Sequence, residues 1–170
     1  TSTPTVASPT STNTPTATAS PTATNTSTAT RAAATSTPTI SLGQSMTFVP
    51  VADSYVDSSQ PNANFGTATT LRVDASPSVN SYLRFSVVGA GGRSISRVRL
   101  LVRANSTSTS GLVVRSVATN TWGETTIKFS NAPAMGSSLA ASAAVRSGTW
   151  ITRNVTGYVT GNGTFSFGIT

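Results

Sequence analysis

The stretch Ser81-Tyr82-Leu83-Arg84-Phe85-Ser86-Val87 decides the fold of this chain, because apolar and more polar side chains alternate along it. Leu83, Phe85 and Val87 share one phase of the alternation. Successive side chains of a β-strand point to opposite faces, so the pattern predicts a strand that buries its odd-numbered residues. A second stretch, residues 164–169, alternates in the same way.

Short segments rich in β-branched and aromatic residues continue this pattern on both sides. Turn formers such as Gly89-Ala90-Gly91-Gly92 separate them, no useful length has a helical period, and the Ala-rich piece Leu139–Val145 is interpreted as loop. This spacing predicts an all-β fold, an antiparallel β-sandwich of the jelly-roll type. The predicted strands are Thr47–Val56, Thr70–Asp74, Ser81–Val88, Ile95–Arg103, Leu112–Ala118, Thr125–Phe129, Thr149–Val155 and Thr164–Ile169.

The first 38 of the 170 residues differ sharply from the rest in composition. They hold 15 Thr, 6 Ser and 5 Pro, and they have too little apolar surface to form a core. We therefore divide the chain into an extended Thr/Ser/Pro-rich stalk or assembly arm at residues 1–38 and a β-sandwich domain at residues 39–170.

Every even position from 10 to 30 is Thr except Ser20, so an extended chain carries its hydroxyls on one side. Tracts of this composition are typical of O-glycosylated stalks, and an unmodified flexible linker is the alternative. The predicted O-glycosylation sites are Thr10, Thr12, Thr14, Thr16, Thr18, Thr22, Thr24, Thr26, Thr28 and Thr30.

The formal net charge is +7, from ten Arg and one Lys against four acids. Arg97, Arg99 and Arg103 share one phase of a predicted strand and form a basic stripe. The stripe indicates either a surface for acidic polysaccharide or a solvated sheet face; the scatter of the other arginines argues against a nucleic-acid partner. No apolar run reaches the roughly 20 residues of a membrane span, and the composition favours an extracellular location.

The chain has neither Cys nor His, so catalysis would depend on four carboxylates, and we expect no enzymatic activity. Asp53, Asp57, Asn62 and Asn64 supply oxygen ligands of the kind that Ca²⁺ prefers. A structural Ca²⁺ ion is therefore one prediction for these residues, and capping of turns by their side chains is the alternative. We expect no other cofactor.

Several motifs occur in an order that resembles the DNRLRE-type domains, which are secreted bacterial β-sandwich modules counted among carbohydrate-binding modules. The resemblance spans residues 47–170. It is carried by Phe48-Val49-Pro50-Val51-Ala52-Asp53-Ser54-Tyr55-Val56-Asp57, Pro61-Asn62-Ala63-Asn64-Phe65-Gly66, Leu71-Arg72-Val73-Asp74, Ser81-Tyr82-Leu83-Arg84-Phe85, Asn120-Thr121-Trp122-Gly123-Glu124-Thr125-Thr126-Ile127, Asn131-Ala132-Pro133 and Gly148-Thr149-Trp150.

This resemblance implies a sandwich that, in some members, binds acidic or neutral polysaccharide. Trp122 and Tyr55 would then stack on a sugar and Glu124 would accept a sugar hydroxyl; the alternative gives all three structural roles. Trp150 is predicted to lie in the core.

Two departures from the family pattern bear on function. Ser86 and Asn154 stand where the family commonly has aspartate, which weakens an inherited cation site. The chain also stops at Thr170, before the family's usual closing strands, which suggests a sheet that another chain completes. The predicted assembly strand lies within Thr39–Phe48 and uses Ile40, Leu42, Met46 and Phe48.

Two functional hypotheses follow. The first is a non-catalytic structural or adhesive protein of the bacterial cell surface, whose copies assemble into a filament or matrix by strand addition. The alternative is a carbohydrate-binding module that the Thr-rich tract tethers to a polysaccharide-degrading enzyme or to the cell surface.

Overall fold

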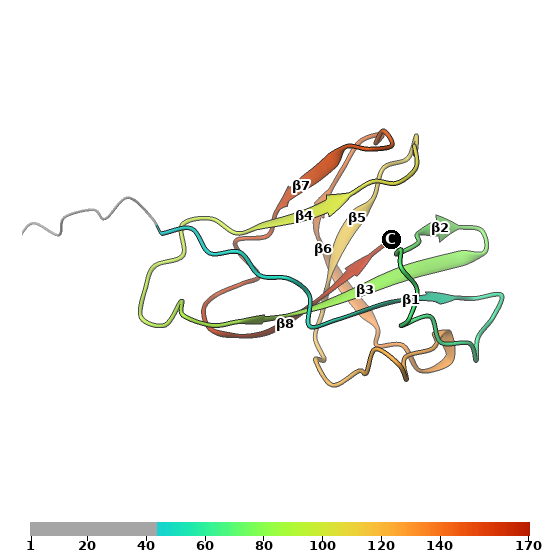
Figure 1. The fold of residues 1–170 in the computed structure, drawn as a ribbon, viewed down its shortest axis with the longest axis horizontal. Helices are drawn as coiled ribbons and strands as arrows, with labels where there is room; N and C mark the ends of the chain where they lie inside the picture. The colour runs from blue at the N-terminus through green and yellow to red at the C-terminus, as the bar shows by residue number, and fades with distance from the viewer. Residues whose placement is uncertain (1–43) are drawn as a thin grey trace, which may run out of the picture. The chain divides into compact units, whose positions relative to one another are not determined.

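The computed structural model describes residues 44–170, which form an all-β domain (Figure 1). The predicted O-glycosylation sites, Ile40 and Leu42 lie outside the described residues. The elements of the described part are β1 (Ala52–Asp57), β2 (Asp74–Ala75), β3 (Ser78–Val87), β4 (Arg99–Arg103), β5 (Val113–Val117), the 3-10 helix η1 (Phe129–Asn131), β6 (Met135–Ala141), β7 (Trp150–Asn154) and β8 (Gly163–Ile169).

Most of these strands belong to one antiparallel sheet with the order β1-β3-β8-β5-β6, and β2 pairs with β3 beside this path. The two stretches with the clearest alternation, β3 and β8, are direct neighbours, and Leu83 pairs with Phe167. The last strand, β8, has β3 on one side and β5 on the other. The sequence suggested an incomplete sheet at the end of the chain, but β8 is paired on both sides. The edges of this sheet are β1 and β6.

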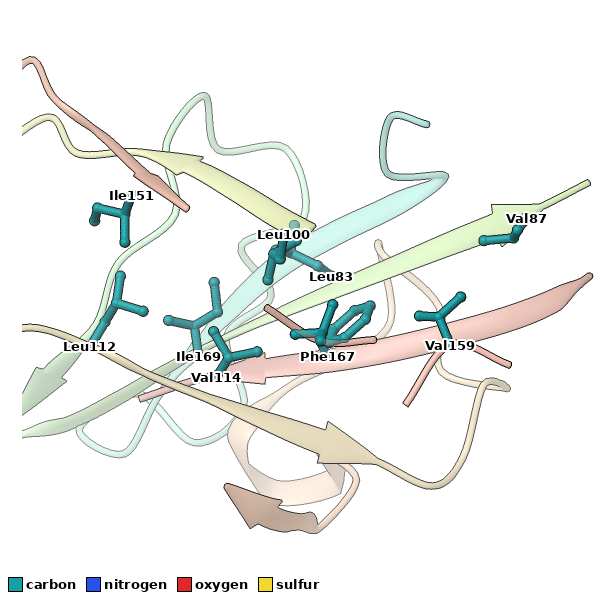
Figure 2. Packing of buried hydrophobic residues seen from close by; sticks show 10 residues of the cluster. Leu83, Val87, Leu100, Leu112, Val114, Ile151, Val159, Phe167 and Ile169 are labelled. Atoms are coloured by element: carbon teal, nitrogen blue, oxygen red, sulfur yellow. The ribbon is translucent and has the colours of Figure 1, made fainter. Parts of the chain in front are cut away.

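A second, two-stranded sheet of β4 and β7 covers one face of the large sheet (Figure 1). Leu100 and Ile151 point from this layer toward Val114, Phe167 and Ile169 of the large sheet (Figure 2). All five residues are buried and belong to one apolar cluster. The predicted antiparallel β-sandwich is therefore confirmed.

The opposite face of the large sheet is also covered. Tyr82 directly precedes Leu83 in β3, but its side chain belongs to a second apolar cluster because neighbouring side chains in a strand face opposite ways. The irregular segment between β5 and β6 supplies Trp122 and Ile127 to this cluster. The second cluster consists of Ala52, Val56, Tyr82, Val117, Trp122 and Ile127.

Two strand predictions are wrong, and one strand was not predicted. Residues 125–129 form a turn followed by the start of η1, because the Gly123 carbonyl accepts hydrogen bonds from the N–H groups of both Thr126 and Ile127. The stretch 70–74 is irregular except at Asp74, where β2 begins. The unpredicted strand is β6, which overlaps the segment interpreted as loop only at residues 139–141; it is a half-exposed edge strand that pairs with β5 alone, where low β-propensity is tolerated.

Within residues 44–170, we find no helix with the length and apolar character needed to cross a bilayer.

Substitutions of the two neighbouring leucines in β4 test which face of this strand packs on the large sheet. We expect Leu100→Ala to lower the free energy of unfolding by about 2–5 kcal/mol, since Leu100 is buried between the sheets. Leu101→Ala is the matched control: this side chain is 54% exposed, so its loss should change stability by less than about 0.5 kcal/mol. Urea denaturation of both variants measures the difference, and equal losses would contradict the orientation of β4.

Candidate functional site

Trp122 is enclosed on several sides. Its indole N–H donates to Ser166 Oγ at 3.1 Å, and its ring meets Tyr82 edge-on at 5.9 Å between centroids. The guanidinium of Arg84 lies 5.1 Å from the ring centroid and donates to the Trp122 carbonyl. With 7% of its surface exposed, Trp122 presents no open ring face for a sugar.

Glu124 holds two loops and an edge strand together. Its carboxylate accepts a hydrogen bond from the Asp53 N–H of β1 at 3.2 Å. Its carbonyl accepts one from the Asn64 side-chain amide at 2.8 Å, and the same amide also donates to the Ile127 carbonyl at 2.7 Å. The family-like motifs at residues 61–66 and 120–127 thus bind each other, and Glu124 satisfies a backbone donor on an edge strand.

The carboxylates predicted to bind Ca²⁺ have distinct surroundings. Burial, together with the charge of Glu124, raises the pKa of Asp53 above its ordinary value. Asp57 accepts hydrogen bonds from the Ser59 hydroxyl at 2.6 Å and the Ser59 N–H at 2.8 Å, and these bonds lower the pKa of Asp57. Asn62 Oδ1 accepts a hydrogen bond from the Ser130 hydroxyl at 3.3 Å.

Within the described residues, no three His, Cys, Asp or Glu side chains gather as metal ligands would. The hydrogen bonds of Asp57 and Asn64 are those expected of side chains that cap turns. A Ca²⁺ ion at Asp53, Asp57, Asn62 and Asn64 stays a prediction.

Tyr55 packs as a core residue does. It is 8% exposed, and its ring stacks on Phe65 with centroids 4.3 Å apart and planes inclined by 12°. Arg72 lies 5.6 Å from the Tyr55 ring centroid. The sequence placed Tyr55 among the sugar-stacking candidates, and the structure instead leaves little of its ring open.

The basic stripe lies on the second sheet. Arg99 and Arg103 point outward from β4, and Arg97 is exposed just before that strand. Arg103 pairs across the sheet with Trp150 of β7. Trp150 is 64% exposed, so its predicted place in the core is wrong. Ile151 in β7 and Val155 just after it are buried on the opposite phase, and this alternation was the sequence signal that places Trp150 outside.

We call this surface the β4–β7 outer face. It consists of three cross-strand pairs whose six side chains are all exposed and, being directly opposite one another, share one side of the sheet. The pairs are Arg99 with Asn154, Leu101 with Thr152, and Arg103 with Trp150.

A groove of about 1200 Å³ begins at one end of this surface, where Arg103 contributes to its lining. The segment 69–75 and the Ser/Thr-rich loop 105–110 form much of its wall. Arg72 and Arg115 also line it, against the single carboxylate of Asp74. Positive charge therefore continues from the outer face into the groove.

Two of the predicted assembly residues lie within the described domain. Phe48 packs against the same chain's main apolar cluster. Met46 is 46% exposed, and its methyl group lies where a side chain on Gly89 would stand. Phe48 is thus occupied in its own domain.

Comparison with known proteins gives one family. The model of carbohydrate-binding module family 96 matches residues 44–170, which is the whole described domain. No curated protein matches the chain.

A substitution at Gly66 tests whether the close contact between residues 61–66 and 120–127 stabilises the domain. A Cβ atom at this position would lie 2.0 Å from the Glu124 carbonyl oxygen, so we expect Gly66→Ala to destabilise the domain by about 1–3 kcal/mol. Gly157→Ala is the control, because a Cβ there meets no atom within 4 Å. Thermal and urea unfolding of both variants measure the difference; a Gly66→Ala protein as stable as the control would contradict the loop contact.

Proposed function

The chain belongs to carbohydrate-binding module family 96, and from that premise we propose that its domain binds an extracellular polysaccharide without cleaving it. The match over residues 44–170 is the observation that carries this proposal. Modules of this type are non-catalytic. The sequence has neither His nor Cys, which fits this non-catalytic role.

The uses of the carboxylates agree with binding rather than turnover. Glycoside hydrolysis by paired carboxylates requires an acid and a second carboxylate facing each other across a substrate cleft. Glu124 is bonded to the backbone of β1, and Asp57 is bonded to Ser59. Asp74 lines the groove without a second carboxylate among the residues that form it.

The charge favours a polysaccharide that carries carboxylate or sulfate groups. The net charge is +7, and arginines line both the β4–β7 outer face and the groove. Guanidinium groups match the planar geometry of carboxylates and bind them with two parallel hydrogen bonds. Positive surfaces also speed the encounter with an anionic polymer.

The family match favours a carbohydrate-binding module over a subunit that assembles into a filament. The assembly hypothesis depended on an N-terminal strand that leaves its own domain, and Phe48 packs against that domain's main apolar cluster. We propose that residues 1–38 act as a tether to an enzyme or to the bacterial cell surface. We also propose that threonines 10–30 carry O-linked sugar, which would extend this tether and keep it soluble.

Binding without turnover is tested by affinity electrophoresis of the full chain in gels with a neutral, a carboxylated or a sulfated polysaccharide. We expect retardation by an anionic polymer that weakens as salt is raised, since salt screens exposed charges. The size of the polymer and its number of reducing ends should stay unchanged after incubation. Retardation by no polymer, or new reducing ends, would contradict the proposal.

The glycosylation proposal is tested by the intact mass of the chain purified from its native source. We expect a series of masses above that of the bare polypeptide, spaced by whole sugar residues, with fragment ions placing the sugars on threonines 10–30. A chain produced in a host without O-glycosylation is the control. Equal masses from the two sources would reject the modification.

A further inference from the structure

The β4–β7 outer face places a large aromatic ring beside two arginines. Trp150 is the most exposed aromatic among the large apolar side chains of the described residues, and Leu101 beside it is 54% exposed. No hydrogen bond or ion pair engages the guanidinium of Arg99 or Arg103 within residues 44–170. None of the four acids lies on this face, so nothing in the domain neutralises it.

Beneath this face the strands are firmly held. Leu100 and Ile151, the inward neighbours of Leu101 and Trp150, are buried in the main core (Figure 2). Just beyond the end of β4 and the start of β7, the Ala104 N–H donates to the Thr149 carbonyl at 2.9 Å and the Gly148 N–H donates to the Ala104 carbonyl at 2.8 Å. These bonds fix Trp150 opposite Arg103, so a ligand would meet a surface that is already in place.

We propose that the β4–β7 outer face is the surface on which the domain binds its polysaccharide; this assignment rests on the proposed function. The Trp150 ring stacks on the apolar C–H face of a sugar ring, as exposed indoles do with flat ligands that are apolar on one side. Arg99 and Arg103 hold carboxylate or sulfate groups on flanking residues of the polymer. Thr152 offers a hydroxyl to sugar hydroxyls between them.

The dimensions of the sheet suit a polymer rather than a small molecule. Arg99 and Arg103 stand four residues apart on one strand, which separates their Cα atoms by about 13 Å. A polymer chain lying along β4 can present a charged group to each of the two positions. Single-stranded nucleic acid shares this combination of anionic backbone and stacking rings, and the family match favours the sugar polymer.

The test compares full-length variants in binding to the anionic polysaccharide that retards the unaltered chain. Trp150→Ala should weaken the affinity about tenfold or more, and Trp150→Phe should restore part of it. Arg99→Ala and Arg103→Ala should each weaken it about two- to fivefold and reduce its salt dependence. The unfolding midpoints should stay near that of the unaltered chain, because these side chains are exposed.

Two variants outside the face serve as controls. Phe129→Ala removes a 36% exposed ring on η1, and Arg93→Ala removes one positive charge from the turn before β4. Both should bind as the unaltered chain does, which separates a local contact from a change in net charge or surface apolarity. Bound polymer should also protect the unaltered chain's tryptophan fluorescence from acrylamide, and this protection should disappear in Trp150→Ala.

The outcomes separate the site from the function. Binding of Trp150→Ala within twofold of the unaltered chain would overturn the site and leave the proposed function standing. An unaltered chain that binds no polysaccharide would overturn both. Mixed-sequence single-stranded DNA that binds as tightly as the best polysaccharide, with the same loss on Trp150→Ala, would overturn the ligand assignment.

Discussion

The large sheet is covered on both faces, and this constraint determines where everything else in the domain lies. Leu83 and Tyr82 are neighbours in β3 yet enter different apolar clusters, so both faces of the middle of this strand are covered. The two-stranded β4–β7 layer covers one face, and the irregular segment with Trp122 and Ile127 covers the other. The motif loops therefore act as a covering layer, and the open sheet surface with an exposed aromatic ring is the outside of β4 and β7.

Sequence reasoning identified the strands in which apolar and more polar residues alternate along the sequence. In β3 and β8 the apolar phase was visible, and the fold class followed from it together with the spacing of the other strands. Sequence reasoning failed where tertiary contacts decide the conformation of a segment. The β-branched residues 125–127 are held in a turn by the Gly123 carbonyl, and β6 is a strand of small residues that exists because β5 offers it a partner. Neither contact is local enough in the sequence to be predicted from propensity.

The candidate site was predicted only in part, for a related reason. The arginines of β4 were recognised by their shared phase, but Trp150 was assigned to the core because large aromatic residues are usually buried. Its register opposite Arg103 depends on which strand pairs with β4, and no local pattern gives that. Conversely, Trp122 and Glu124 attracted attention through the family-like motif. Their bonds to Ser166 and Asp53 indicate that this motif holds the scaffold together.

The arginines and the tryptophan of the β4–β7 outer face are not equally strong evidence for a bound ligand. A two-stranded sheet has open edges, and charged side chains on such strands discourage edge-to-edge pairing with other chains. Arg99 and Arg103 are thus explained by solubility as well as by an anionic ligand. Trp150 is not, because an exposed indole beside an exposed Leu101 favours association instead of opposing it. Protection against aggregation would favour a polar residue at position 150, as at the neighbouring outward positions Thr152 and Asn154. A stacking partner removes this conflict, so the case for a ligand on this face depends chiefly on the tryptophan, and the arginines determine which ligands it accepts.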